Sequence, residues 1–514
     1  MVKVTRYCSF LLFSVLTLSV WSQVKPTIEY KITLPDPASH RYHVELHTKG
    51  WNQDSLVLKM PKWTPGYYQI MNYAKAVENL TVRDTKGENV SYEKRSENQI
   101  VLKNIRNRSL QIAYEIMTSR KFVASCYVDA EHAYLTPAGT FFYPDGFLQL
   151  PVTVEIIPIP WKHIATGLEP LPGNPNLFHA SDFDILYDCP ILIGNLEELP
   201  SFTVNNVPHR FIGYNLGTFD KQQFIDKLAK ITKTAVDIIG DIPYKQYTYI
   251  AIGPGRGGIE HLNNTTVSFD GAELSTPDGM NRMMNFLAHE YFHHFNVKRI
   301  RPFELGPFDY DKGSRTNLLW VSEGLTVYYE YLMVKRAGLV DEQTLFSFLE
   351  GNINNHENNP GKVHQSLTQS SYNTWKDGPF GTQGEEPGKT ISYYEKGPIV
   401  GLLLDFHIRH ATQNKKSLDD VMRLLYWRYY KEKQRGFTDA EFEQTCEEVA
   451  DVPLGKFFEF VYTTHELDYK QYLGFAGLTL EETTVNQKRK LILKRVAQPN
   501  AKQTEILNAW LGEK

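Results

Sequence analysis

The 514-residue sequence has few cysteines, a small net charge and, after its first residues, no long apolar run. None of its four cysteines has the spacing of a structural zinc site, which argues against a site of that kind. The formal net charge of −4 argues against a general binder of polyanions, so no nucleic-acid partner is expected. No later stretch reaches about 18 consecutive apolar residues, so no transmembrane helix is predicted. The composition, 42% hydrophobic and 22% charged, is typical of a large packed protein.

Residues 1–22 have the character of a secretory signal peptide. Lys3 and Arg6 supply a positive start, residues 10–20 a short apolar stretch, and Ser22 a small residue before the expected cleavage point. The apolar stretch is too short for a comfortable membrane span. We therefore expect export to the periplasm or the extracellular space.

Three cysteines lie beyond this segment, namely Cys126, Cys189 and Cys446. The first two could form a disulfide, but three cysteines cannot all pair within one chain. Spacing alone does not decide the question.

The most informative stretch is His289-Glu290-Tyr291-Phe292-His293, which reads H-E-x-x-H. On a helix, the two histidines lie one turn apart on the same face. Two imidazoles placed in this way can bind one Zn²⁺, and the glutamate between them can reach a water on that metal. Zinc lowers the pKa of its water toward neutrality, and a carboxylate can then take the proton. The spacing therefore predicts amide hydrolysis, with two histidine ligands and Glu290 as the base.

The surrounding sequence favours a helix at this motif over a chance match among the 16 histidines of the chain. Thr276 suits an N-cap, Pro277 the first helical position, and Asp278 the positive end of a helix. The apolar residues between 283 and 287 continue the helical pattern, which places the motif well inside the helix. His294 is turned about 100° from His293, so we interpret it as a neighbour and not a ligand.

A zinc site of this kind needs a third protein ligand and an open fourth position. Residues 317–333 form an apolar, aromatic-rich segment that is long enough for a buried helix. Because a lone carboxylate inside such a segment is costly unless it is paired or bound to metal, Glu323 is the best candidate. Glu330 is a weaker alternative, better suited to the helix surface or to a hydrogen bond.

H-E-x-x-H followed by a glutamate on a second helix is the gluzincin pattern, and the sequence around it resembles the M61 peptidases, the glycyl aminopeptidase family. The resemblance extends over nearly all of the chain beyond the signal peptide. The matching segments are residues 63–67 (WTPGY), 257–261 (GGIEH), 289–310, 318–332 and 393–397 (YYEKG). It implies a zinc aminopeptidase that acts on peptides, with small first residues such as Gly or Ala preferred.

Residues 257–261 are similar to the family's exopeptidase motif. Glycines beside a strand let the backbone approach a ligand closely, and a carboxylate there can bind a substrate's α-ammonium. A surface turn with a solvated glutamate is the alternative from the residues alone. The resemblance favours Glu260 as the amino-terminus anchor, with Gly257 and Gly258 as substrate-binding residues.

Tyr394 is the candidate oxyanion donor. A phenol near the metal can donate a hydrogen bond to the charge that develops on the tetrahedral intermediate. Any one of the 30 tyrosines could instead be structural, and the adjacent Tyr393 would face a different direction. The resemblance of the Tyr-Glu-Lys-Gly sequence to related gluzincins favours Tyr394.

The pattern of elements predicts an α+β protein. Short segments with β-type composition fill residues 23–200 and predict a β-sandwich-like domain. They are residues 30–34, 41–48, 55–60, 99–104, 109–116 and 150–158. A helix over 220–239, a strand over 247–252, a glycine-rich bend and the two site helices follow. These match a thermolysin-like, mainly helical peptidase domain over residues 201–475.

Two further segments stand outside these predicted elements. The polar stretch 352–389 is long for a loop and is either part of the cleft or a surface excursion. Residues 476–514 form a short tail, too short for the PDZ domain that many family members carry. Ile506, Leu507, Trp510 and Leu511 in this tail suit a docking helix.

We therefore predict one Zn²⁺ per chain, held by His289, His293 and Glu323, in an exported aminopeptidase. A catalytically silent peptide-binding protein on the same scaffold, a zinc endopeptidase, and a hydrolase of a non-peptide ester or epoxide are the alternatives. The sequence does not indicate the oligomeric state.

Overall fold

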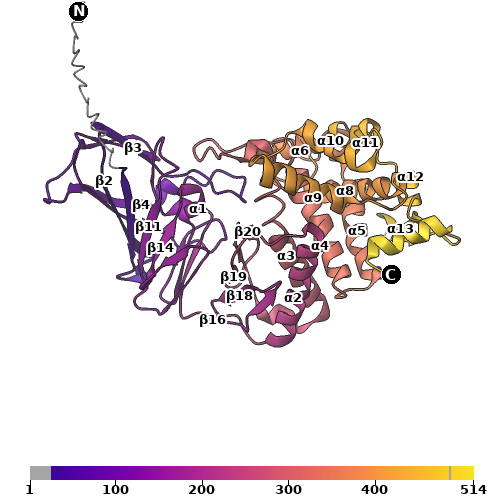
Figure 1. Ribbon diagram of the computed structural model, residues 1–514, viewed down its shortest axis with the longest axis horizontal. Helices are drawn as coiled ribbons and strands as arrows, with labels where there is room; N and C mark the ends of the chain where they lie inside the picture. Colours follow the sequence, from indigo (N-terminus) through magenta and orange to yellow (C-terminus); the bar gives the residue numbers. More distant parts are fainter. Residues whose placement is uncertain (1–24, 486–487, 514) are drawn as a thin grey trace, which may run out of the picture.

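The computed structural model describes residues 25–485 and 488–513. The expected signal peptide lies outside the described residues. A β-rich part comes first in the chain and a mainly helical part follows, and the two lie side by side along the long axis of the molecule (Figure 1). This arrangement confirms the α+β fold class expected from the sequence.

A seven-stranded sheet with the order β13-β14-β11-β1-β2-β7-β4 dominates the first part. Its strands are β1 (Thr27–Thr33), β2 (Arg41–Lys49), β4 (Val77–Asp84), β7 (Leu110–Met117), β11 (Val152–Ile157), β13 (Glu169–Leu171) and β14 (Asn174–Ala180). Strand β1 pairs antiparallel with β2 and parallel with β11. Every second residue of β2 is buried, Val44 and Leu46 among them, because successive side chains of a strand point to opposite faces.

Two four-stranded sheets, with the orders β10-β3-β6-β5 and β12-β15-β9-β8, and the short helix α1 (Phe183–Tyr187) complete this part. The strands are β3 (Ser55–Lys59), β5 (Tyr92–Ser96), β6 (Gln99–Lys103), β8 (Tyr127–Val128), β9 (His132–Leu135), β10 (Tyr143–Pro144), β12 (His163–Thr166) and β15 (Ile191–Gly194). Leu56 and Leu58 of β3 share one apolar core with Val44 and Leu46 of β2. The sheets thus enclose a common core, as in a sandwich.

The second part opens with a sheet that leads to the site, in the order β16-β18-β19-β21-β20 with β17 also paired to β18. Its strands are β16 (Glu197–Glu198), β17 (Phe202–Val204), β18 (Val207–Gly213), β19 (Tyr247–Ala251), β20 (Gly258–Glu260) and β21 (Asn264–Val267). Helix α2 (Lys221–Ile239) joins β18 to the parallel strand β19. Strand β20 lies at the edge of this sheet and carries Glu260.

Helices make up most of the remainder. They are α3 (Pro277–Phe292), α4 (Leu325–Arg336), α5 (Glu342–Glu357), α6 (Leu367–Tyr372), α7 (Thr374–Asp377), α8 (Tyr393–Ala411), α9 (Leu418–Leu425), α10 (Asp439–Ala450), α11 (Gly455–Tyr462) and α12 (Tyr469–Gly474), with π-helical turns at Trp320–Gly324 and Tyr426–Glu432. Strand β19, the glycine-rich bend, α3 and α4 follow one another as the sequence predicts.

The expectation of a long loop over residues 352–389 is wrong. The first residues of this stretch complete α5, and α6 and α7 follow. Capping explains the helices, because the Ser366 side chain accepts from the Gln369 N–H and the Gln369 side chain reaches back. Only the residues between α7 and α8 form a loop of some length.

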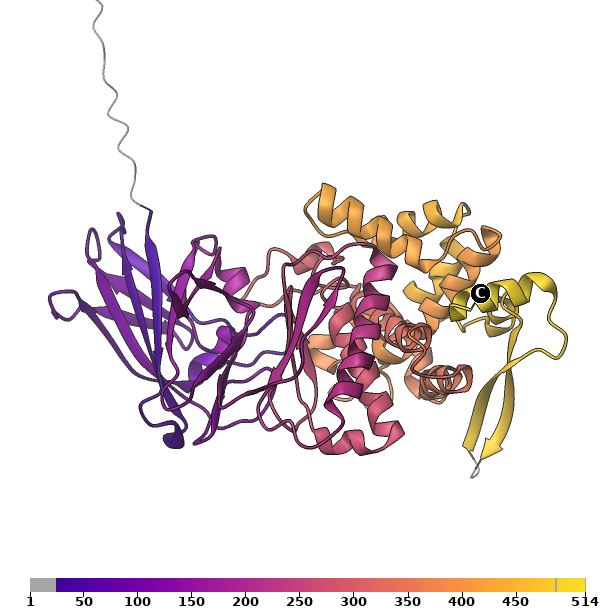
Figure 2. The same cartoon turned by 60° about the horizontal axis from the view of Figure 1, so that its bottom comes forward.

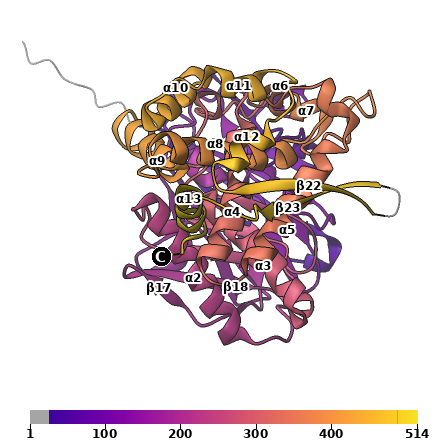
Figure 3. The ribbon, with the colours of Figure 1, turned by 90° about the vertical axis from the view of Figure 1, so that its right-hand side faces the viewer.

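The last elements are a hairpin and a helix, β22 (Leu478–Val485), β23 (Lys488–Arg495) and α13 (Ala501–Leu511) (Figures 2 and 3). Strand β23 lies against α5, where Asn354 and Glu350 accept from the Leu491 and Leu493 N–H groups. Helix α13 buries the four apolar residues expected of a docking helix. The Trp510 indole donates to the Tyr328 hydroxyl at 2.9 Å, which fixes α13 to α4.

One large apolar core is formed mainly by residues before about 196, and the other mainly by residues after it. The domain boundary near residue 200 stays a prediction. Cys126, Cys189 and Cys446 are buried free thiols, so no disulfide joins the first two. Within residues 25–485 and 488–513, no helix has both the length and the apolar character needed to cross a bilayer.

Candidate metal centre and substrate cleft

Helix α3 begins as the sequence predicts but ends earlier. The Thr276 hydroxyl accepts the Gly279 N–H at 3.1 Å, and Pro277 is the first helical residue. The regular helix ends at Phe292, so the motif occupies its last turn and does not lie well inside it. His293 is the C-cap, but its backbone keeps helical angles and its N–H donates to the His289 carbonyl. The one-turn spacing is therefore retained.

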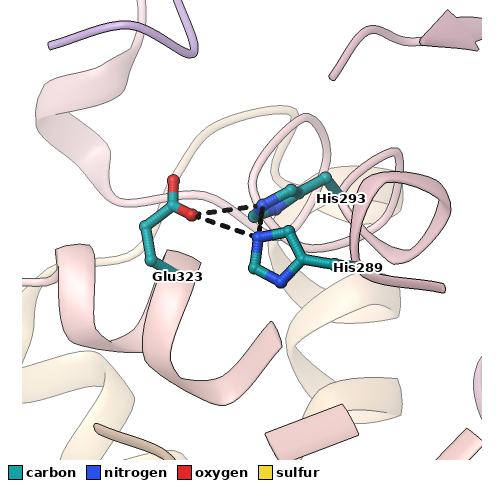
Figure 4. A group of neighbouring side chains, drawn as sticks. All are labelled: His289, His293 and Glu323. Carbon is teal, nitrogen blue, oxygen red and sulfur yellow. Dashed lines mark hydrogen bonds and ion pairs between the residues drawn. The ribbon is translucent and has the colours of Figure 1, made fainter. Parts of the chain in front are cut away.

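His289, His293 and Glu323 converge on one point (Figure 4). The two Nε2 atoms are 2.9 Å apart, and the Glu323 Oε2 lies 3.2 Å from that of His293 and 3.6 Å from that of His289. Their side chains are only 12%, 2% and 3% exposed, in sequence order. Ligands at about 2.0–2.1 Å from a tetrahedral zinc stand roughly 3.3 Å apart, so these separations suit that ion.

The far nitrogens of both imidazoles are held by hydrogen-bond acceptors. The Nδ1 of His289 lies 2.7 Å from the Glu330 carboxylate, and that of His293 lies 2.6 Å from the Asn296 carbonyl. A proton on each Nδ1 leaves both Nε2 lone pairs directed at each other and at Glu323. Three electron-pair donors that face one another at this distance repel unless a cation lies between them, so the donor set fits a metal. Glu330 is the hydrogen-bonding partner that the sequence allowed.

Asn296 connects His293 to the segment that carries Glu323, and sequence reasoning did not identify it. While its carbonyl accepts from His293, its side-chain amide donates to the Val321 carbonyl at 2.7 Å and the Thr326 hydroxyl at 3.0 Å. Glu323 lies on the π-helical turn before α4, a local irregularity that is frequent at functional sites. In the sequence, the only indication of a role for Asn296 is its position three residues after His293.

Glu290 lies beside the metal group on the side of β20. It is 4% exposed, and the Thr265 hydroxyl donates to its Oε2 at 3.3 Å. Burial raises the pKa of Glu290 to about 7, although the two histidines oppose the shift. A Cβ at Gly258 would lie 2.3 Å from the Glu290 carboxyl carbon, so this glycine makes room for the carboxylate.

Tyr394 reaches the same group from α8. Its hydroxyl donates to the Glu323 Oε2 at 2.8 Å, and its ring lies 6.2 Å from that of His289. Burial and the nearby Glu323 charge raise the pKa of Tyr394, so it keeps its proton and acts as a donor. The Tyr393 hydroxyl instead forms a hydrogen bond with Thr374, which directs it elsewhere as expected.

Glu260 lines a cavity of about 80 Å³ together with Gly66 and Tyr68. Its carboxylate is close enough to the metal group for its charge to act on His293 and Glu290. Its side chain is buried, and the described residues offer its carboxylate no hydrogen bond or ion pair. A Cβ at Gly66, which has a φ of +91°, would meet both Glu260 oxygens at 3.0–3.1 Å. A buried carboxylate without a partner is costly, so this geometry suits a cationic ligand.

The β-rich part contributes directly to the cleft through residues 63–69. The Trp63 indole donates to the Asp309 carbonyl at 2.7 Å, and the Gln69 amide to the Thr374 carbonyl at 2.8 Å. Burial raises the pKa of Tyr68, and the neighbouring charges of Glu323 and Glu260 raise it further. Tyr68, which directly follows the predicted motif at 63–67, is a site residue that the sequence reasoning missed.

Gly257 does not face Glu290 as Gly258 does. Its φ is +88°, and a Cβ there would be in ordinary contact with Val123. In the structure, the absence of a side chain at Gly258 leaves space for the Glu290 carboxylate. Substrate binding by either glycine stays a prediction.

Together, the two-helix His-His-Glu group, the buried glutamate beside it and the edge strand define a metallopeptidase of the gluzincin type. Residues 29–195 match the Peptidase M61 N-terminal domain, and residues 282–400 match the M61 glycyl aminopeptidase domain. These matches cover more than half of the chain, which belongs to the M61 peptidase family.

Solved structures are similar over most of the chain. An aminopeptidase N family protein from Idiomarina loihiensis has a TM-score of 0.83 and 25% identity, over 89% of this chain and 80% of that one. A yeast LTA4 hydrolase in complex with bestatin has a TM-score of 0.51 and 15% identity, over 86% and 68%. An M1 zinc metallopeptidase variant from Deinococcus radiodurans bound to Tyr-Ser-Ala has a TM-score of 0.50 and 14% identity, over 86% of this chain and 95% of that one. The last two show a shared fold. No curated protein matches the chain.

Proposed function

We propose that the protein is an exported zinc aminopeptidase that removes the first residue from peptides. The observation that carries the proposal is the unpartnered Glu260 carboxylate, whose charge acts on His293 and Glu290 of a His-His-Glu group with its own glutamate base. The signal-peptide character of residues 1–22 supports export.

His289, His293 and Glu323 would hold one Zn²⁺, which as a Lewis acid polarises the scissile carbonyl and makes water a stronger nucleophile near neutral pH. The hydrogen bonds that the two Nδ1–H groups donate to the Glu330 carboxylate and to the Asn296 carbonyl hold the rings in the required tautomer.

Glu290 is the proposed base. Its buried carboxylate lies beside the metal group, where it can accept a proton from the attacking water and release it again. The proton that Glu290 takes up passes to the nitrogen of the departing peptide, which then leaves as an amine. The carboxylate is regenerated for the next cycle.

Tyr394 is the proposed oxyanion donor. Its hydroxyl now donates to Glu323, and a rotation of that O–H toward the substrate would place the donor at the carbonyl oxygen. A donor of this kind contributes most where negative charge develops, so its loss lowers turnover more than binding.

Glu260 is the proposed anchor for the free amino terminus. A charge-assisted hydrogen bond from an α-ammonium to this carboxylate would satisfy the buried charge. Resemblance to the glycyl aminopeptidases supports Gly or Ala as the preferred first residue. Gly257 and Gly258 would lie along the bound backbone.

The direct experiment compares one peptide with a free amino terminus and the same peptide acetylated. The proposal predicts release of the first residue from the free peptide and resistance of the acetylated one. Glu260→Gln should remove most of the advantage of the free amine, and Glu482→Gln, an exposed hairpin glutamate, should not. Equally fast internal cleavage of the acetylated peptide would make the enzyme an endopeptidase, and zinc binding without hydrolysis would make it a silent binding protein.

A further inference from the structure

Three aromatic rings lead from the metal group to the surface. The His289 and Tyr394 rings are 6.2 Å apart, and the Tyr394 and Phe380 rings are 5.4 Å apart. Successive planes are tilted by only 30° and 33°. Phe380 is 62% exposed, so one face of its ring packs on the candidate oxyanion donor while much of the side chain faces solvent.

Phe380 is held in a defined turn. The Gly381 N–H donates to the Gly378 carbonyl at 3.1 Å, and these two glycines have φ values of +64° and +72°. The Ser392 hydroxyl donates to the Pro379 carbonyl at 3.0 Å and accepts the Tyr394 N–H at 3.1 Å. One side chain thus fixes both the turn that carries Phe380 and the start of the helix that carries Tyr394.

A single exposed apolar side chain is ordinary on a protein surface. An exposed aromatic ring that is fixed against a residue of the active site is a different case, because it offers apolar area at little conformational cost on binding. Such a ring suits an apolar side chain of the substrate.

The direction of the bound peptide decides which side chain that is. Glu260 would hold the amino terminus at the cavity that it lines, and Tyr394 would face the scissile carbonyl. Phe380 packs on Tyr394, so it lies next to the position given to the scissile carbonyl and not at the position given to the amino terminus. The residue that follows the scissile bond therefore passes Phe380.

We propose that Phe380 is a specificity-determining residue that binds an apolar side chain on the residue after the scissile bond. The inference rests on the proposed aminopeptidase function and adds a preference at the second residue of the substrate. Because the ring is partly exposed, the expected preference for Leu over Ser is roughly 10-fold in kcat/KM, near the lower limit for apolar pockets.

The test uses peptide amides that begin with Ala and carry Leu or Ser as the second residue. In the full-length protein, Phe380→Ala should bring the Leu-to-Ser ratio of kcat/KM to within about twofold of unity, mainly through a higher KM for the Leu peptide. Phe380→Leu should retain part of the ratio. Phe303→Ala, the same change at another half-exposed phenylalanine, should leave it at the wild-type value.

A second peptide series, with the first residue varied and the second constant, tests the direction. Phe380→Ala should leave the ratios of this series unchanged. An unaltered second-residue ratio in Phe380→Ala, or an effect confined to the first residue, would overturn the inference while the aminopeptidase activity stands. If the wild-type protein releases no residue from any free peptide, the proposed function fails and the inference fails with it.

Discussion

Gly324 and Gly397 pack directly against each other. A Cβ added to either would lie 2.7 Å from the other's Cα, a distance that real Cβ atoms do not adopt. Gly324 follows Glu323 on the π-helical turn, and Gly397 lies one helical turn after Tyr394 on α8. The contact explains how two segments far apart in sequence bring the Tyr394 hydroxyl to 2.8 Å from Glu323.

We predict that Gly397→Ala separates these segments and slows hydrolysis. A displacement of about 1 Å at a catalytic group can lower a rate by roughly 10²-fold, and overpacking costs about 1–3 kcal/mol of stability. Gly351→Ala on α5, where a Cβ meets nothing within 4 Å, is the matched control. Steady-state kinetics and thermal unfolding of both variants check this, and a Gly397→Ala enzyme with wild-type kcat would show that the contact is unimportant.

Gly258→Ala should act on the base. The new methyl group would lie 2.3–2.7 Å from the Glu290 carboxyl group, which must then move away from the attacking water. We expect kcat to fall by roughly 10²-fold with the zinc content unchanged. Gly455→Ala, where a Cβ has open space, serves as the comparison. Loss of zinc with the base still functional would place the effect at the ligands instead.

Removal of the Glu330 carboxylate should weaken metal binding without removal of a ligand. Partners of ligating histidines typically contribute 10–100-fold to metal affinity, and Glu330 contacts His289 at 2.7 Å. A chelator competition assay on Glu330→Ala should therefore show a zinc Kd raised by about that factor, and the exposed-site variant Glu482→Ala should show none. Equal affinities in both variants would mean that Glu330 does not hold the ring.

Asp188 should make the protein sensitive to acid. It belongs to the first part of the chain and pairs with Lys298 of the second at 2.5 Å, with His261 at 3.3 Å. Burial alone would raise the pKa of Asp188, but these partners hold it at about 2. Because the pKa of Asp188 is lower in the folded than in the unfolded state, its ionised form stabilises the fold by about 2–3 kcal/mol above about pH 4. This contribution to the free energy of unfolding is lost as the pH falls toward 2.

Unfolding measured between pH 5 and 2.5 tests this linkage. Asp188→Asn should lower stability at pH 5 and flatten the acid-side slope relative to the wild type. Asp237→Asn, at an exposed aspartate on α2, should retain the wild-type slope. Parallel slopes for the wild type and Asp188→Asn would refute the role of this pair.

The part of the site that depends on local spacing could be predicted from the sequence. The four-residue interval of His289 and His293 has a meaning on any helix, and Glu323 is conspicuous as a carboxylate in an apolar segment. Glu260 and Tyr394 were found only through family resemblance, because nothing in their neighbourhood of sequence distinguishes them. The structure places both beside the metal group, and their roles remain proposals.

Tyr68 and Asn296 could not be predicted, since their roles arise from tertiary contacts. Tyr68 reaches the cleft from the β-rich part. The Asn296 side chain donates a hydrogen bond to the carbonyl of Val321, more than 20 residues later in the chain. Residues 352–389 were expected to be a loop because of their Asn, Ser and Gly content. Capping and burial against α8 instead stabilise helices there, which the polar composition conceals.

The most direct test of the central claim is a joint measurement of zinc content and peptide hydrolysis in the wild type and in Glu290→Gln. The account predicts one zinc per chain in both proteins, with hydrolysis by the variant lower by roughly 10²–10⁴-fold because Gln cannot accept the proton. Near-normal turnover by Glu290→Gln, or full activity of a wild-type protein that contains no zinc, would contradict it.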